Sequence, residues 1–245
     1  MSKAFELLQQ VEREQGFAGS AAAVAVAPTN GNGVRRNVVN SDEIARLVQR
    51  LFRTPDTVVP RVVVFSSVES GGGCTSICTA AAENLAAVAP GGFCIVDGNL
   101  RSPSLHHYFD LENRVGLADA LVQAGPIQSF CQRVAGTNLW VLPSGSTPPD
   151  VNALLSSDAL PARMAELRSE FNHVLVDSAP LNRASDAVLL GRASDGLLLV
   201  LESNATRRET ARNIMESLKS SNVRLLGAVL NKRTFPIPQN LYDRL

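Results

Sequence analysis

Between residues 61 and 231, short apolar runs alternate with longer segments in which apolar residues recur at helical spacing. The apolar runs that predict strands are residues 61–67, 92–97, 139–145, 172–179, 195–202 and 223–231. Helical patterns separate most of them, at residues 75–88, 116–123, 151–169, 184–193 and 206–220. Strands that are apolar throughout and alternate with helices are typical of a parallel sheet with helices on both faces. The predicted fold class is therefore α/β, with a doubly wound, mostly parallel sheet.

The first forty residues follow a different pattern. Residues 1–16 place apolar side chains at helical spacing, which predicts a short amphipathic helix. Residues 17–40 mix small residues with Pro, Asn and Gly, and this composition is typical of a flexible linker. Ser41 and Asp42 can cap a helix that follows them. We therefore divide the chain into a helix at 1–16, a linker at 17–40 and one globular domain at 41–245.

A glycine-rich turn, SVESGGGCTS, follows the first predicted strand. Its glycines, residues 71–73, allow backbone N–H groups to turn inward, and the helix that starts near Cys74 adds the positive end of its dipole. This arrangement is typical of a phosphate-binding loop, although a glycine-rich turn without a ligand fits the same pattern. Thr75 stands where the hydroxyl of a P-loop binds Mg²⁺, and Cys74 stands where a P-loop has its lysine.

The replacement of that lysine by Cys74 removes a positive charge from the loop. A charge-assisted hydrogen bond to a phosphate oxygen contributes about 1.5–3 kcal/mol, so we expect nucleotide binding to be weaker by about ten- to a hundred-fold. The lysine also neutralises charge that develops during phosphoryl transfer, so catalysis should suffer as well. Cys74 could instead be a reactive thiol of low pKa at a helix N-terminus. An inert replacement is the simpler interpretation.

Two aspartates stand at the carboxyl ends of predicted strands. Asp97 is the last residue of the strand predicted at 92–97, and Asp177 stands near the end of the strand predicted at 172–179. A carboxylate in such a place can accept a proton from a hydroxyl group or hold a metal-bound water. A lone aspartate after a strand is more often a turn residue. Two of them beside a glycine-rich loop predict a ligand site at the carboxyl edge of the sheet.

Five segments in succession resemble the motifs of one protein family: SSVESGGGCTSI, IVDGNLRSPSLHHYFDLENRVGLADAL, LPSGSTPPDVNALLSS, HVLVDSAPLNRASDAVLL and LGAVLNKR. The family is that of the bacterial tyrosine kinases of capsule and exopolysaccharide synthesis. These kinases are a branch of the P-loop ATPases with a deviant Walker A motif. The resemblance runs from about residue 41 to residue 233, which is most of the chain.

The resemblance implies ATP and Mg²⁺ as ligands. The candidate nucleotide-binding residues that it implies are Gly71, Gly72, Gly73, Cys74, Thr75, Ser76 and Asn231, the last on the adenine side. The candidate metal-binding residues are Thr75, Asp97 and Asp177, and the two aspartates are also the candidate catalytic residues. Asp97 matches the first aspartate of the Walker A′ motif, which helps to activate a tyrosine hydroxyl, whereas Asn99 replaces the second. Asp177 matches Walker B.

The resemblance also implies an oligomer and a phosphate acceptor. Glu43 and Arg46 match part of an E-x-x-R-x-x-R helix that assembles rings in the family, but Gln49 replaces the second arginine. The family's kinases phosphorylate a cluster of tyrosines in a flexible tail. Here only Tyr242 stands in the tail, because Tyr108 belongs to a structured motif.

Charged functional positions are changed at residues 49, 74 and 99, while the glycines and the apolar scaffold are kept. We therefore expect a regulatory homologue of the exopolysaccharide or capsule kinases, a pseudokinase with weak nucleotide binding and little kinase activity. The implied partner is a membrane-embedded protein that controls polysaccharide chain length or export. An active ATP-dependent tyrosine autokinase of the same pathway is the first alternative, and a partitioning-type ATPase is the second.

Composition bears on the partners and on the location. Lys+Arg and Asp+Glu both number 23, and no basic patch stands out, so nucleic acid is not an expected partner. The 4 cysteines form no Cys-x-x-Cys pair, which favours a reducing compartment. The sequence contains neither a long apolar run nor a signal-like start. We therefore expect a cytoplasmic protein, peripheral at the inner membrane through its partner.

Overall fold

The computed structural model describes residues 22–23, 41–52, 59–203 and 205–232. The helix predicted at 1–16, most of the predicted linker and the tail with Tyr242 lie outside the described residues. Within these ranges, none of the helices combines the length and the apolar composition that a membrane span requires.

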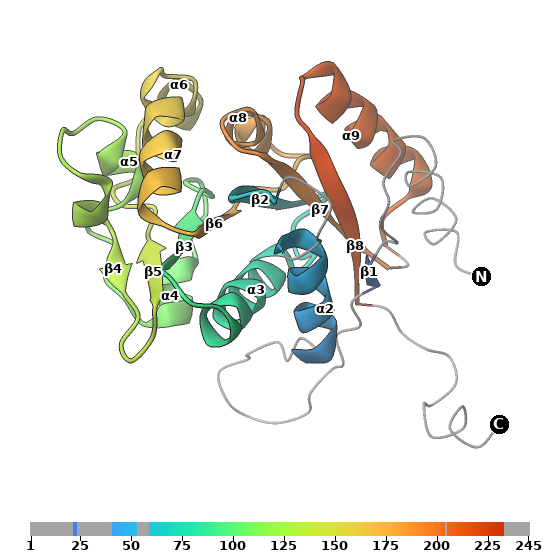
Figure 1. Cartoon of the computed structure of the whole chain (residues 1–245). Coiled ribbons are helices and arrows are strands. Elements are labelled where there is room, and N and C mark those ends of the chain that lie inside the picture. The colour runs from blue at the N-terminus through green and yellow to red at the C-terminus, as the bar shows by residue number, and fades with distance from the viewer. Residues whose placement is uncertain (1–21, 24–40, 53–58, 204, 233–245) are drawn as a thin grey trace.

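In the described part of the chain, the strands form one 8-stranded sheet with the order β1-β8-β7-β2-β6-β3-β5-β4 (Figure 1). The strands are β1 (Ala22–Ala23), β2 (Val62–Ser67), β3 (Phe93–Asp97), β4 (Gln132–Arg133), β5 (Leu139–Leu142), β6 (His173–Asp177), β7 (Gly196–Glu202) and β8 (Leu225–Asn231). All neighbouring strands are parallel except β4 and β5. The prediction of a doubly wound, mostly parallel sheet is confirmed.

The helices connect these strands and largely match the predicted segments. They are α2 (Ser41–Phe52), α3 (Cys74–Val88), α4 (Leu105–Phe109), α5 (Leu117–Ala120), α6 (Val151–Leu155), α7 (Ala159–Glu170), α8 (Asp186–Arg192) and α9 (Arg208–Ser220), with a short 3₁₀ helix at Ile127–Phe130. The single helix predicted at 151–169 is wrong in one respect, because the structure divides it into α6 and α7. The Ser157 hydroxyl donates to the carbonyl of Leu154 at 2.7 Å, and such a bond competes with helix continuation.

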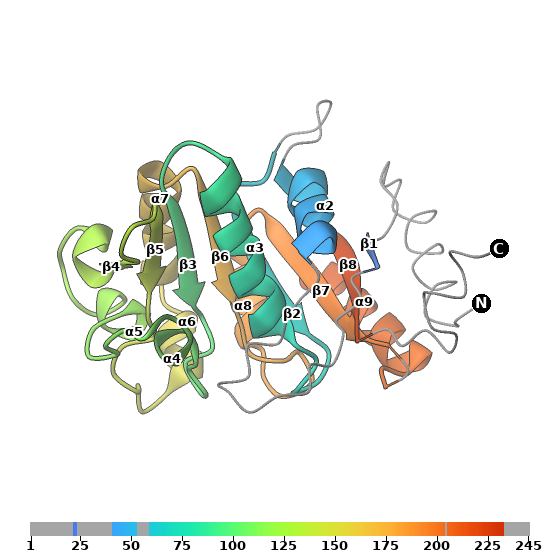
Figure 2. The ribbon, with the colours of Figure 1, turned by 90° about the horizontal axis from the view of Figure 1, so that it is seen from below.

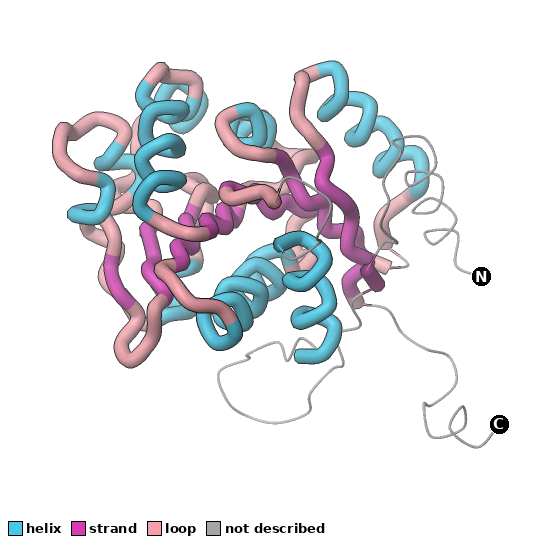
Figure 3. Tube along the Cα trace, in the orientation of Figure 1, coloured by secondary structure: helices cyan, strands magenta, loops and turns pink. Residues whose placement is uncertain are grey.

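Helices cover both faces of the sheet. Helices α2 and α3 lie on one face, and α7, α8 and α9 lie on the other (Figures 1 and 3). Each central strand therefore sends alternate side chains into two separate cores. In β2, Val63 and Phe65 join the core under α2 and α3, whereas Val62 and Val64 join the core on the opposite face.

The parallel arrangement brings the carboxyl ends of the central strands to one edge of the sheet. In Figure 2 the arrowheads of β2, β3 and β6 point to this edge, where their following loops gather. The strand order places β6 between β2 and β3. The glycine-rich loop after β2 and the two strand-end aspartates thus meet at the same place, as predicted from the alternation of strands and helices.

Candidate functional site

The loop at residues 68–73 connects β2 to α3 and takes its shape from two glycines. Gly71 and Gly73 have φ angles of 82° and 83°, a left-handed conformation that is costly for any residue with a side chain. Gly73 immediately precedes the first residue of α3, Cys74. A Cβ atom at Gly72 would lie 3.1 Å from the Cβ of Ser67. The backbone therefore turns tightly into the N-terminus of a long helix, as a phosphate-binding loop does.

Asn231, at the end of β8, supports this loop from the side. Its Nδ2 donates a hydrogen bond to the carbonyl oxygen of Gly72 at 2.8 Å, and its Oδ1 accepts one from the N–H of Lys232 at 2.8 Å. The side chain is buried, and a Cβ atom at Gly73 would collide with its amide nitrogen. Asn231 thus fixes the position of the loop, a contact that the sequence motifs did not reveal.

Thr75 and Asp177 form the centre of the site. The Thr75 hydroxyl donates to Oδ2 of Asp177 at 2.6 Å, while Oδ1 of Asp177 is buried and has no hydrogen-bond partner. The Asp177 residue is only 1% exposed. Burial raises the pKa of this carboxyl to about 7. The hydrogen bond from Thr75 lowers the pKa, the charge of Asp97 raises it, and the nearby Cys74 thiol lowers it. A buried carboxylate oxygen beside a hydroxyl has the chemistry of an incomplete Mg²⁺ coordination shell.

Asp97 lies directly opposite Asp177 on the neighbouring strand, β3. Its Oδ2 accepts hydrogen bonds from the N–H groups of Ser104 and Leu105 at 2.9 and 3.0 Å, and its Oδ1 accepts one from Asn99 at 3.3 Å. Burial raises the pKa of the Asp97 carboxyl, although these bonds act in the opposite direction. Asp97 therefore holds the turn that follows β3 in place, in addition to lying beside Asp177.

Cys74 faces the protein interior. It is 7% exposed and packs in the core under α2 and α3 with Ile77 and Cys78. Burial, together with the negative charge of Asp177, raises the pKa of the Cys74 thiol well above its usual value. The alternative of a reactive, low-pKa thiol is therefore wrong. The position of the missing lysine holds a neutral, buried side chain.

The remaining candidates stand on other elements or differ in their burial. Ser76 is half-buried in the first turn of α3, and Asn99 is half-buried in the turn after β3. Glu43 and Arg46 are on α2, where Glu43 is half-buried and Arg46 is exposed. Tyr242 lies outside the described residues.

The loop after β3 is tied to α8 by an ion pair that the sequence did not predict. Nε and Nη2 of Arg101 donate to the two carboxylate oxygens of Asp186 at 2.8 and 3.1 Å. Both residues stand in recognisable motifs, but 85 residues separate them, so no local pattern signals the contact. The pair fixes two loops of the site relative to each other.

These groups fit a nucleotide with Mg²⁺ at most points. The left-handed glycines, the helix N-terminus, the Thr75 hydroxyl and the unpartnered Oδ1 of Asp177 provide the amides and oxygens that such a ligand requires. The one mismatch is at Cys74, which provides no positive charge.

Several curated proteins similar in sequence to this chain are tyrosine-protein kinases. The chain is 32% identical over 216 residues to the tyrosine-protein kinase YwqD of Bacillus subtilis, which covers 85% of this chain and 91% of YwqD. It is 29% identical over 146 residues to the putative tyrosine-protein kinase CapB of Staphylococcus aureus, with 60% and 63% covered. It is 27% identical to the tyrosine-protein kinase wzc of Salmonella typhi, but spans only 24% of that protein. No protein-family profile matches the chain.

Solved structures confirm the fold. The chimerical protein CapA2B2 superimposes with a TM-score of 0.77 at 24% identity, covering 93% of this chain and 100% of the other. The kinase domain of the Escherichia coli tyrosine kinase ETK gives 0.75 at 18% identity, covering 95% and 96%. A plasmid partition protein of Borrelia burgdorferi gives 0.53 at 15%, covering 76% and 87%. Since the similarity to YwqD extends over 91% of that kinase, the chain belongs to the family of bacterial tyrosine-protein kinases that its motifs predicted.

Proposed function

We propose that this protein is a regulatory member of the bacterial tyrosine kinase family, with weak nucleotide binding and little kinase activity. The observation that carries the proposal is the buried, neutral thiol of Cys74 at the position of the Walker A lysine. The glycine loop and the Thr75–Asp177 pair support retained binding of ATP with Mg²⁺. The loss of the cation supports weak binding and poor transfer, because charge on the transferring phosphoryl group is left without its main counter-charge.

The residues present divide the work of binding as follows. The backbone amides of residues 71 and 73–75 and the α3 dipole would attract the phosphates. The N–H of Gly72 is not available, because it donates to the carbonyl of Glu69 at 3.4 Å. The Thr75 hydroxyl and the carboxylate of Asp177 would hold Mg²⁺, which when bound neutralises phosphate charge. Asp97, at the next strand end, would orient the acceptor hydroxyl and take its proton. With Asn99 in place of a second aspartate, that acceptor side has one carboxylate fewer.

The pathway and the partner follow from the family resemblance. We propose a role in exopolysaccharide or capsule synthesis, in which the protein lies at the inner membrane by contact with a membrane-embedded chain-length or export protein. Self-association through the α2 face that bears Glu43 and Arg46 belongs to the same proposal. An active tyrosine autokinase with Tyr242 as acceptor is the second candidate, and the intact Thr75–Asp177 hydrogen bond favours it.

Calorimetric titration of the full chain with MgATP tests the proposal. We expect weak binding by the unchanged protein, and binding tighter by about ten- to a hundred-fold in Cys74→Lys. The thiol of Cys74 is buried, but an ammonium is too costly to bury unpaired, so the longer lysine side chain should extend out of the core and place its charge beside the phosphates at the start of α3. Cys74→Ala is the matched control, since it removes the thiol without adding charge, and should bind as the unchanged protein does. Incubation with labelled ATP should leave Tyr242 largely unmodified.

Two results would contradict the proposal in different ways. Low-micromolar MgATP binding with strong phosphorylation of Tyr242 in the unchanged protein would establish the autokinase instead. Equal affinity of Cys74→Lys and Cys74→Ala, with both variants folded by thermal melting, would mean that the loop does not hold phosphates.

A further inference from the structure

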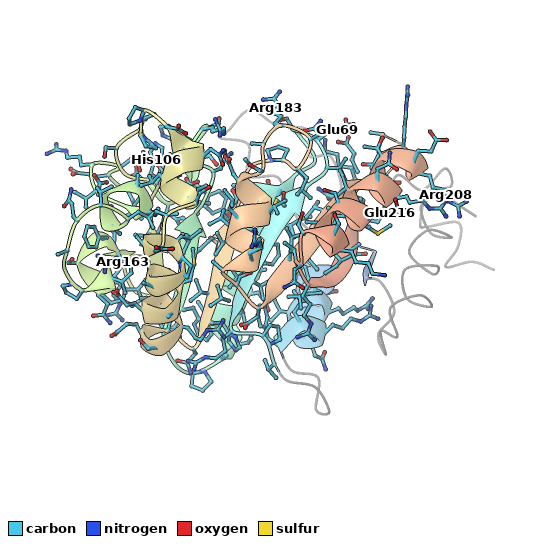
Figure 4. The ribbon with its side chains drawn as sticks, turned by 90° about the horizontal axis from the view of Figure 1, so that it is seen from above. Glu69, His106, Arg163, Arg183, Arg208 and Glu216 are labelled. Atoms are coloured by element: carbon cyan, nitrogen blue, oxygen red, sulfur yellow. The ribbon has the colours of Figure 1, made fainter. Side chains whose placement is uncertain are left out.

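The loop after β6, residues 178–185, lies against the end of β2 and the start of the glycine loop. The N–H groups of Leu181 and Asn182 donate to the carbonyl oxygens of Ser67 and Val68 at 2.9 and 3.1 Å. Arg183 is the next residue, and its own N–H closes a turn on Pro180 at 3.1 Å. In Figure 4 the labelled Arg183 and Glu69 stand at the same edge of the molecule. The positively charged residue Arg183 thus lies in the loop after β6, which contacts the start of the glycine loop.

Few positive charges are available at this position. On the loops that follow β2, β3 and β6, residues 68–73, 98–104 and 178–185, the sequence places only Arg101 and Arg183 as basic residues. Arg101 is committed to the buried carboxylate of Asp186 at 2.8 Å. Arg183 is exposed, and its guanidinium forms no hydrogen bond or ion pair with the residues that the structure describes. Of the two basic residues on these three loops, Arg183 is therefore the one whose guanidinium is available to bind a ligand.

The charges of the site create a need for such a cation. Asp97 and Asp177 are buried at the strand ends, Glu69 is exposed on the glycine loop, and Cys74 is neutral. The loop amides and the helix dipole carry only partial positive charge, so a full cation nearby would strengthen the attraction of a polyphosphate to this site. An arginine forms paired, charge-assisted hydrogen bonds with phosphate oxygens, and its long side chain is free to turn toward them.

We propose that Arg183 supplies to the phosphates of a nucleoside di- or triphosphate the positive charge that Cys74 does not. The inference rests on the proposed nucleotide site and names the residue that compensates for its altered Walker A motif. In this arrangement the positive charge comes from the loop after β6 and not from the first residue of α3. Arg183 therefore acts as a phosphate-binding residue, and it distinguishes nucleotides with a polyphosphate from nucleosides.

Calorimetric titrations with MgATP and with adenosine test this role in four variants of the full chain. Arg183→Gln should weaken MgATP binding by about ten-fold or more and leave adenosine binding unchanged, because only the phosphate contact is lost. Arg207→Gln is the matched control: an exposed arginine after β7, it should change MgATP affinity less than two-fold. Cys74→Lys and the double variant Cys74→Lys/Arg183→Gln complete a cycle, in which the new lysine should reduce the effect of Arg183→Gln several-fold.

The outcomes separate this inference from the proposed function. If Arg183→Gln binds MgATP as the unchanged protein does, or if Arg207→Gln weakens binding equally, Arg183 has no special role and the nucleotide site stands without it. If neither the unchanged protein nor Cys74→Lys binds MgATP, the nucleotide site itself is absent and the inference fails with it. Thermal melting verifies that each variant is folded, which the exposure of both arginines favours.

Discussion

At the residue scale, the two oxygens of the Asp177 carboxyl have different surroundings. Oδ2 accepts the Thr75 hydroxyl at 2.6 Å, and Oδ1 is buried without a partner. A buried acceptor without a partner carries a desolvation cost of about 1–3 kcal/mol, more when it is ionised. The protein reduces this cost by holding the carboxyl in its neutral form up to a pH of about 7, which is the pKa to which burial raises it. The site is therefore least stable when Asp177 is ionised and no cation is bound.

We expect Asp177→Asn to gain stability relative to the unchanged protein as the pH rises. Because the pKa of Asp177 is raised in the folded state, its contribution to stability is full below the unfolded pKa and is lost as the pH rises to about 7. The amide does not titrate. Between pH 5 and pH 8, the difference in unfolding free energy should therefore move by about 2–3 kcal/mol in favour of the variant. Urea titrations in a chelator, without divalent metal ions, measure this difference.

Asp195 provides a control with the opposite sign. Burial raises the pKa of its carboxyl, but hydrogen bonds from Arg168 and from the N–H groups of Val62 and Arg61 outweigh burial and hold the pKa below its usual value. Its contribution to stability is therefore already complete at pH 5 and is lost only at lower pH. Asp195→Asn should be destabilised by the same amount at pH 5 and pH 8. A constant difference for Asp177→Asn as well would contradict the buried-carboxyl interpretation.

The two left-handed glycines of the loop allow a matched comparison. Gly71→Ala places a Cβ atom in open space, so it should cost only the backbone strain of about 1–2 kcal/mol. Gly73→Ala adds the same strain and also drives a Cβ atom into the amide of Asn231, so its loss of unfolding free energy should be clearly larger. Chemical denaturation of both variants measures the two costs. If the two variants lose the same unfolding free energy, the Asn231 side chain can move aside for the new Cβ atom and does not fix the loop.

Sequence patterns predicted part of this site. The glycines, Thr75 and the two aspartates were recognisable because each stands next to a strand in an order that local chemistry explains. The support from Asn231 to Gly72 was not, since these residues are 159 positions apart and meet only through the register of β7 and β8. The sequence favoured an inert Cys74, but it did not show the cause, which is the burial of the thiol in the core under α2 and α3.

At the element scale, the long elements were predictable and the short ones were not. Helices α3 and α9 and five of the six central strands agree with the predicted segments to within two residues, and β5 ends three residues earlier than predicted. Strands β1 and β4 have two residues each, and α4 has five, too few for a periodic pattern. Strand β1 also falls inside the predicted linker, because its pairing with β8 uses backbone groups and needs no bulky side chains.

The ion pair between Arg101 and Asp186 should stabilise the site far more than a surface pair does. The Asp186 side chain is fully buried, whereas that of Arg101 is 47% exposed. Arg101→Ala would leave a buried carboxylate without its partner, with an expected loss of about 3 kcal/mol in unfolding free energy. Arg114→Ala is the control, since Arg114 and Glu112 are 83% and 69% exposed and their pair contributes about 0–1 kcal/mol. Urea denaturation of both variants tests the difference, and similar losses would argue against a buried tie between the two loops.

At the scale of the whole molecule, one sheet separates two apolar cores. Alternate residues of each central strand belong to different cores, as Val63 and Val64 do, so neither core can lose its order without releasing one side of the same strands. The backbone hydrogen bonds between parallel strands join both layers. The described domain should therefore unfold as one cooperative unit in spite of its two cores.

A single tryptophan makes this cooperativity measurable. The chain has 1 Trp, Trp140 in β5, which packs against the core beneath α7 near Phe171. Leu85→Ala removes a buried side chain from the opposite core and should cost about 2–5 kcal/mol. If the sheet couples the cores, Leu85→Ala should lower the urea midpoint of the Trp140 fluorescence transition as much as that of the circular dichroism transition. Leu167→Ala, which removes an α7 side chain from the core that Trp140 contacts, should also lower both midpoints together. In Leu85→Ala, the fluorescence midpoint could stay unchanged while the circular dichroism midpoint falls. This result would mean that the two layers unfold separately, so that a substitution in the core under α2 and α3 does not disturb the opposite face of the sheet.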